Sequence, residues 1–99
     1  MSYRIEFHPL ASEELDDAYQ WYEDRSPGLG IRLIEKVEEA LSILSNQPYS
    51  RGKKLREYRE FRINTFPYLL VYEVLEKQKL VFISYVFHTS RNPKLKYKR

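Results

Sequence analysis

Two side chains that can carry chemistry close the last apolar stretch of the sequence. Residues 80–93, LVFISYVFHTSRNP, read as a buried β-strand that ends near His88, and Arg91 follows three residues later. A histidine moves protons near neutral pH, and an arginine can hold a phosphate through two parallel hydrogen bonds. The segment is therefore either the edge of a working site or a strand end at which His88 makes one structural hydrogen bond.

Cationic and tyrosine side chains supply a second candidate group. Residues 48–54, PYSRGKK, form a predicted basic loop, and residues 89–99 carry five basic residues and no acid. Lysine and arginine clusters attract a phosphate backbone through counterion release, and exposed tyrosines stack on unstacked bases. The candidate nucleic-acid-binding residues are Lys53, Lys54, Arg56, Tyr58, Lys94 and Tyr97. The alternative is a solvated basic surface, with Tyr97 in a disordered chain end.

Arg62 completes a candidate catalytic set of Arg62, His88 and Arg91. Alternation directs Arg62 outward from its predicted strand, and His88 is assigned to the same open face of the sheet. RNA cleavage needs a base for the 2′-hydroxyl, cations for the charged phosphorane and an acid for the leaving oxygen. Alternatively, Arg62 only pairs with Glu60 or Glu73 across strands.

Composition narrows the classes of function. The 99 residues suffice for one domain, residues 1–99, and the 42% hydrophobic content is enough for a modest core. With no cysteine and only two histidines, no metal and no cofactor is expected. No apolar run approaches the ~20 residues that span a bilayer, which favours a soluble cytoplasmic protein.

The charge is distributed unevenly along the chain. Residues 1–49 hold four basic and ten acidic side chains, a net charge of −6, whereas residues 50–99 hold thirteen and four, a net charge of +9. Such asymmetry favours a polyanionic partner for the second half. The alternative is that the two halves complement each other once the chain folds.

Periodicity predicts a strand followed by two helices. Residues 3–7 alternate as a half-buried strand, and residues 12–24 follow the helical period with Ser12 as a plausible N-cap. A second amphipathic helix is predicted from Ser26 and Pro27 to Asn46. The short connection between the helices predicts an antiparallel helical hairpin.

Three further strands follow the hairpin. They are predicted at residues 55–64, 68–75 and 80–87, with the short loops of an antiparallel meander. In the last strand, Val81, Ile83, Tyr85 and Phe87 are assigned to the apolar row, and Ser84 and His88 to the open one. The order β-α-α-β-β-β predicts a two-layer α+β domain.

Together these segments resemble the RelE/ParE superfamily of bacterial toxins, the toxin halves of type II toxin–antitoxin modules, often labelled plasmid stabilisation proteins. The resemblance rests on the helical hairpin ending in LSNQP, then FRIN, FPYLLVYEV and ISYVFHTSRNP, and it covers nearly the whole chain. It implies a small twisted antiparallel sheet with the hairpin on one face. It also implies a cognate antitoxin as partner, whose extended segment shields the toxin's basic surface.

The resemblance implies two alternative targets. RelE-like members cleave messenger RNA in the ribosomal A site, whereas ParE-like members poison DNA gyrase. By position, Arg62 matches the arginine after the basic loop, and His88 and Arg91 resemble the polar pair closing the last strand. Lys53, Lys54 and Tyr97 resemble the family's lysines and C-terminal tyrosine. The pattern H-x-x-R-x-P also occurs in ParE-like members, so a growth-inhibiting ribonuclease, a gyrase inhibitor and a decayed toxin that only binds its antitoxin remain alternatives.

Overall fold

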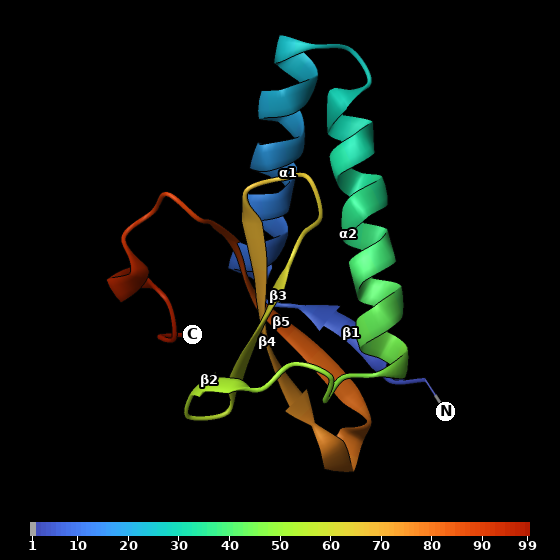
Figure 1. The fold of residues 1–99 in the computed structure, drawn as a ribbon, viewed down its shortest axis with the longest axis vertical. Helices are drawn as coiled ribbons and strands as arrows, with labels where there is room; N and C mark the ends of the chain where they lie inside the picture. Colours follow the sequence, from blue (N-terminus) through green and yellow to red (C-terminus); the bar gives the residue numbers. More distant parts are fainter. Residues whose placement is uncertain (1) are drawn as a thin grey trace.

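Two antiparallel helices lie against one face of a five-stranded mixed sheet in the computed structural model, which describes residues 2–99 (Figure 1). The elements are β1 (Arg4–Phe7), α1 (Pro9–Arg25), α2 (Leu29–Asn46), β2 (Lys53–Leu55), β3 (Tyr58–Arg62), β4 (Tyr68–Leu75) and β5 (Leu80–His88). The strand order is β1-β5-β4-β3-β2, with β1 parallel to β5 and the other neighbours antiparallel. The predicted α+β class is confirmed. The meander has four strands and not the predicted three, because β2 lies mostly on residues that were predicted to be the basic loop. No helix within residues 2–99 is long and apolar enough to cross a membrane.

The helices begin at different residues from those predicted. Helix α1 starts at Pro9 rather than Ser12, because proline's fixed φ suits the first helical position and His8 Nδ1 accepts a hydrogen bond from the Leu10 amide at 3.0 Å. Helix α2 starts at Leu29 rather than beside Pro27, because Gly28 turns the chain with a φ of 91°.

A carboxylate closes the turn between the helices. Glu23 accepts hydrogen bonds from the amides of Gly28 at 3.0 Å and Gly30 at 2.9 Å, which satisfies free donors at the start of α2. These bonds, with that from Gly28 the strongest influence, lower the pKa of the Glu23 carboxyl. Gly30 also sits so near α1 that a Cβ there would lie 2.5 Å from the Tyr19 carbonyl oxygen. The hairpin is therefore held by close backbone approach as well as by its apolar face.

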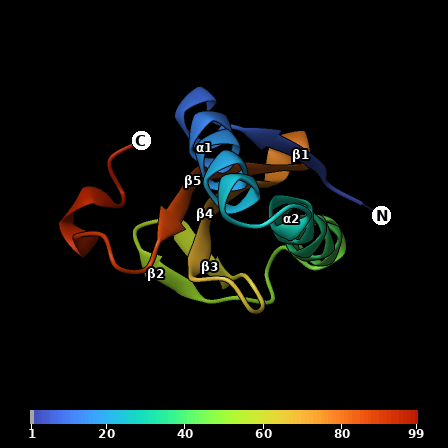
Figure 2. The same cartoon turned by 90° about the horizontal axis from the view of Figure 1, so that it is seen from above.

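The core lies between the hairpin and the sheet. Helix α2 buries Leu33, Val37, Ala40 and Leu44, while α1 buries the small residues Ala11 and Ala18. The sheet contributes buried side chains from β3, β4 and β5: Phe61, Leu70, Tyr72, Val81, Ile83 and Val86. Because α1 presents small side chains, it lies close to the sheet beside β5, as the view from above shows (Figure 2).

A β-bulge at Ser84 reverses the alternation of β5. Tyr72 pairs with Ile83 and Val71 pairs with Tyr85, which leaves Ser84 as the extra residue. Ile83 therefore faces the helices, whereas Tyr85 and Phe87 pack with Tyr58 and Val71 in a second, smaller cluster. The predicted single row of Val81, Ile83, Tyr85 and Phe87 is wrong, because a bulge shifts every later side chain to the other face.

Candidate functional site

The C-terminal segment, residues 89–99, returns to the sheet beyond β5 (Figures 1 and 2). Its anchor is Arg99, whose guanidinium makes two hydrogen bonds of 2.9 and 2.8 Å to the carboxylate of Glu14 on α1. Arg99 also donates to the carbonyl of Ser84 at 2.8 Å and stacks on the Tyr85 ring, 4.0 Å from its centroid. The bulge thus supplies a carbonyl that holds this segment against the sheet, which favours an ordered segment over the alternative of a disordered chain end around Tyr97.

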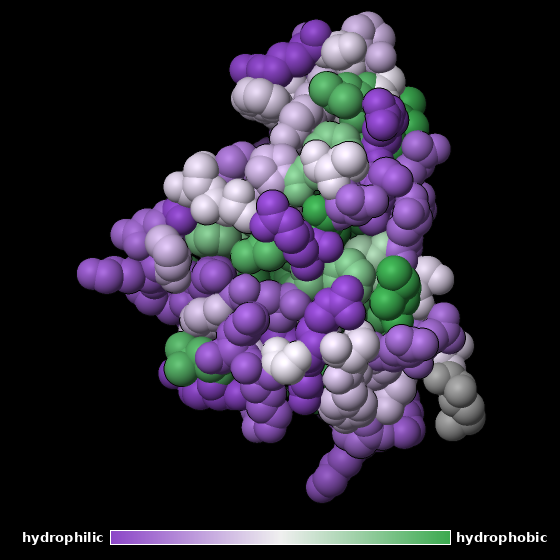
Figure 3. Space-filling view, viewed as in Figure 1, coloured by the Kyte–Doolittle hydropathy of each residue, from purple (hydrophilic) through white to green (hydrophobic). Residues whose placement is uncertain are grey.

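A basic groove of about 650 Å³ separates this segment from the β2–β3 turn. It is lined by Leu55, Arg56, Pro93, Lys94, Lys96, Tyr97 and Lys98. The structure therefore brings together three of the predicted nucleic-acid-binding residues, Arg56, Lys94 and Tyr97. That side of the molecule is mostly hydrophilic in the space-filling view (left in Figure 3). Its lysines and arginine favour contact with an anionic partner.

Three ionisable side chains at this groove are bound to one another. Lys96 Nζ lies 2.8 Å from Glu60 Oε2, and the Tyr97 hydroxyl donates to the same carboxylate oxygen. Burial alone would raise the pKa of the Glu60 carboxyl, but hydrogen bonds from Lys96 and Tyr97 outweigh it and lower that pKa. Burial and the bond to Glu60 raise the pKa of the Tyr97 phenol. Tyr97 therefore holds its proton more tightly than a free phenol does.

The other predicted nucleic-acid-binding residues differ in their setting. Tyr58 is buried, with its ring centroid 5.3 Å from that of Tyr97, so the expectation of an exposed stacking platform there is wrong. Lys53 forms an exposed ion pair of 2.9 Å with Glu57, and Lys54 is exposed on β2. Neither lysine lines the groove.

Arg62 and His88 lie on opposite faces of the sheet. Arg62 pairs with Leu69, which pairs with Phe87, so these three project from the face that the C-terminal segment partly covers. His88 pairs with Tyr68 on the helix side. The prediction that Arg62 and His88 share one open face is wrong, because the Ser84 bulge moves His88 across. Arg62 makes no ion pair with Glu60 or Glu73 within residues 2–99.

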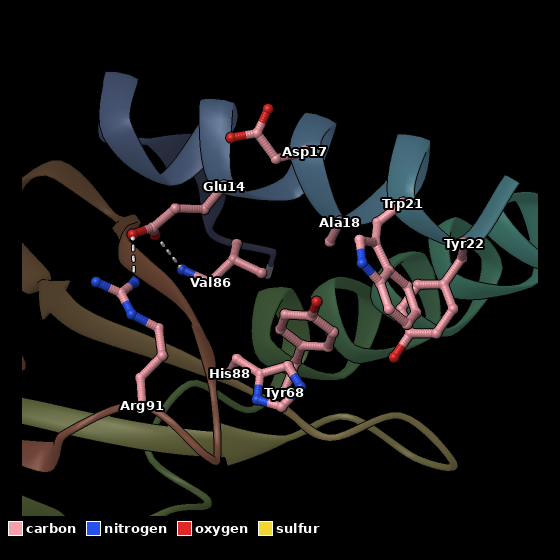
Figure 4. Close-up of a pocket in the computed structure, with 9 residues that line it drawn as sticks. All are labelled: Glu14, Asp17, Ala18, Trp21, Tyr22, Tyr68, Val86, His88 and Arg91. Atoms are coloured by element: carbon pink, nitrogen blue, oxygen red, sulfur yellow. Dashed lines mark hydrogen bonds and ion pairs between the residues drawn. The ribbon is translucent and has the colours of Figure 1, made fainter. Parts of the chain in front are cut away.

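His88 and Arg91 instead border a pocket of about 410 Å³ between α1 and the sheet, which we call the helix-side pocket (Figure 4). The Nδ1 atom of His88 accepts a hydrogen bond of 3.0 Å from the Ser90 amide, so this histidine does complete the strand end as the structural alternative proposed. Arg91 Nη1 lies 3.4 Å from Glu14 Oε2.

The sequence analysis did not single out Glu14 and Trp21, two of the α1 residues that line this pocket. The available signal was Trp21, a large apolar residue next to Gln20 in a helix rich in acidic residues. Within residues 2–99, no group of three or more histidine, aspartate or glutamate side chains is placed to hold a metal ion.

Comparisons with known proteins agree with this architecture. Residues 5–93 match the model of a family described as the ParE toxin of the type II toxin–antitoxin system parDE. No curated protein matches the chain.

Solved structures share the fold. A chain of the chromosomal ParDE toxin–antitoxin system from P. aeruginosa superposes with a TM-score of 0.72 at 18% identity, over 88% of this chain and 96% of that one. The isolated E. coli RelE toxin gives 0.65 at 23% identity, over 94% and 90%. The archaeal RelE–RelB complex from Pyrococcus horikoshii OT3 gives 0.59 at 17% identity, over 93% and 100%. Since the family model spans most of the sequence, the chain belongs to the ParE toxin family of type II toxin–antitoxin systems, and its fold agrees with that of the RelE and ParDE structures.

Proposed function

We propose that this protein inhibits growth by binding DNA gyrase without catalysing a reaction, and that a cognate antitoxin neutralises it. One observation carries the choice of binding over catalysis. The groups that can move protons are separated or already engaged: His88 and Arg62 lie on opposite faces, and Tyr97 is bonded to Glu60. A general acid or base must reach the same reacting atoms as the cationic clamp, which His88 and Arg62 cannot do together from opposite faces of the sheet.

The basic groove is the proposed contact surface for the target. Arg56, Lys94, Lys96 and Lys98 line it, so it suits the DNA that gyrase holds or an acidic surface of the enzyme. The antitoxin proposal draws on relatives solved with antitoxin, including the intact E. coli RelBE complex. A toxin of this kind acts in the cytoplasm, and the module stabilises the replicon that carries it.

A supercoiling assay with purified gyrase tests the proposal. Excess protein should block supercoiling, and the Arg56→Ala/Lys94→Ala double variant should act more weakly because two charges of the groove are lost. Lys36→Ala on α2, away from the groove, is the matched control. Full gyrase activity with excess folded wild-type protein would refute gyrase as the target.

Ribosome-dependent cleavage of messenger RNA is the second candidate. The observation that favours it is a glutamate, a lysine and a tyrosine gathered at a basic groove, with Glu60 and Tyr97 in direct hydrogen bond. Added to a purified translation system, the protein would then cut transcripts, and Tyr97→Phe would reduce cutting while leaving the fold intact. Intact transcripts at high dose would exclude this function.

Growth after induction without antitoxin separates both functions from a decayed toxin. A binding toxin should arrest growth equally well as wild type, His88→Ala or Arg62→Ala, because neither side chain lies in the basic groove. Arrest that is lost in either single variant would point to catalysis. Normal growth with wild-type protein would mean that the chain now serves only to bind its antitoxin.

A further inference from the structure

The helix-side pocket has the size and wall chemistry of a small-ligand site that the proposed toxin function does not use. Its volume of about 410 Å³ falls within the range typical of ligand pockets, roughly 300 to 1,000 Å³. The buried small residues Ala18 and Val86 leave space at its base. Tyr68 and Trp21 stand at its sides, from different layers of the fold (Figure 4).

Aromatic side chains make the pocket suitable for a flat ring. Trp21 is 49% exposed although it is the largest side chain on α1. The Arg25 guanidinium covers one face of its indole, 3.3 Å from the ring centroid, and the Tyr22 ring packs against the indole in a T-shaped arrangement, with centroids 4.9 Å apart. Planar bases stack on such rings with little dependence on sequence.

The polar end of the pocket offers hydrogen-bond donors. The Ser90 amide can only donate, so His88 Nδ1 is the acceptor and the proton of the neutral ring sits on Nε2. The Arg91 guanidinium lies 5.2 Å from the centroid of the Phe87 ring and bonds Glu14 through Nη1, so within residues 2–99 its Nη2 and Nε donors have no hydrogen-bond partner. Glu14 repels an anionic ligand little, since Arg99 binds both of its oxygens.

We propose that this pocket binds a guanine base, either of a free nucleotide or of an unstacked residue in a nucleic acid. Guanine presents two adjacent acceptors, O6 and N7, that match an arginine fork. Adenine places an amino donor beside N7 and would oppose the donors of Arg91 and His88. The aromatic sides hold the ring and Arg91 selects its edge.

Trp21 reports occupancy, because it is the only tryptophan of the chain and borders the pocket. Titration of the full chain with GMP should give saturable quenching of its fluorescence, and AMP should bind several-fold more weakly. Arg91→Ala should weaken GMP binding by about 5- to 150-fold, the value of one bidentate base contact, and remove the preference over AMP. Arg4→Ala, on β1 beside the opposite end of β5, is the matched control and should bind as wild type.

Single-stranded oligonucleotides identify the source of the base. Binding of GMP alone indicates a free nucleotide, whereas Arg91-dependent binding of TTGTT but not TTTTT indicates an unstacked base; either outcome supports the site. Absence of saturable quenching by GMP and by TTGTT would overturn it. Equal binding of all bases would also overturn it. The same holds if Arg56→Ala abolishes binding while folded Arg91→Ala does not, because the contact would then lie in the basic groove.

Discussion

The ion pair between Glu14 and Arg99 should hold the C-terminal segment against the sheet, and a double-mutant cycle measures this. Glu14→Gln keeps an oxygen for the Val86 amide, which lies 2.9 Å from Glu14 Oε1, while removing the charge. Arg99→Gln removes the other charge. The coupling between the two changes isolates the pair from the other contacts of each residue.

Burial sets the expected magnitude. Exposed pairs couple by roughly 0.2–1 kcal/mol, whereas removing one partner of a fully buried pair costs about 3–5 kcal/mol. The Glu14 and Arg99 side chains are 17% and 16% exposed and meet through two bonds, so we expect a coupling of about 1–2 kcal/mol. In a domain of this size, 1 kcal/mol corresponds to a Tm change of roughly 4–8 °C.

Chemical denaturation of the wild type, both single variants and the double variant gives the coupling free energy. Lys53 and Glu57 form the matched control pair, with a similar distance of 2.9 Å but side chains 50% and 68% exposed. Its coupling should stay below about 0.5 kcal/mol. A Glu14–Arg99 coupling no larger than that of the control would refute the reasoning that burial makes this pair an anchor.

Three further predictions concern the fold. Gly30→Ala should lower the free energy of unfolding by about 1–2 kcal/mol, because the clash with the Tyr19 carbonyl exceeds the gain in helix propensity. Gly52 has open space around it, so Gly52→Ala should leave the Tm in thermal melts nearly unchanged. Glu76 accepts hydrogen bonds from Lys79, Tyr49 and Tyr3, which lower its pKa to about 2. The stability that this carboxylate contributes should therefore be lost as the pH falls from about 4.5 to 2. Acid titration followed by circular dichroism should show a smaller loss of stability for Glu76→Gln than for the wild type. Ser84→Ala should raise the Tm, because it removes a buried hydroxyl with no partner within residues 2–99.

Much of the fold was predictable because strong periodicity marks it. The predicted strand at residues 68–75 matches β4, and the helical hairpin is present because the apolar face of α2 recurs at helical spacing. The boundaries near Ser12 and Ser26 were wrong for local reasons. Pro9 with His8, and Gly28 with Glu23, provide better helix starts than a serine alone.

The candidate site was less predictable because a single residue, Ser84, decides on which face of the sheet the later side chains of β5 lie. Ser84 has no sequence signature of a bulge, yet it separates His88 from Arg62 and creates the carbonyl that Arg99 binds. Long-range partners such as Glu14 and Arg99, 85 positions apart, have no local pattern to reveal them. The gathering of Arg56 and Lys94 did follow from charge, because basic residues dominate both segments that line the groove.

The pairing of β1 with β5 has a consequence for the synthesis of this protein. The first strand, Arg4–Phe7, has its sheet neighbour at Leu80–Ile83, so β1 cannot join the sheet until the chain beyond Ile83 has left the ribosome. A nascent chain that stops earlier lacks most of β5, the strand between β1 and β4, and leaves part of the apolar face of the hairpin uncovered. Such truncated products would be incompletely folded and open to proteolysis, so the proposed inhibition of growth would require a nearly full-length chain.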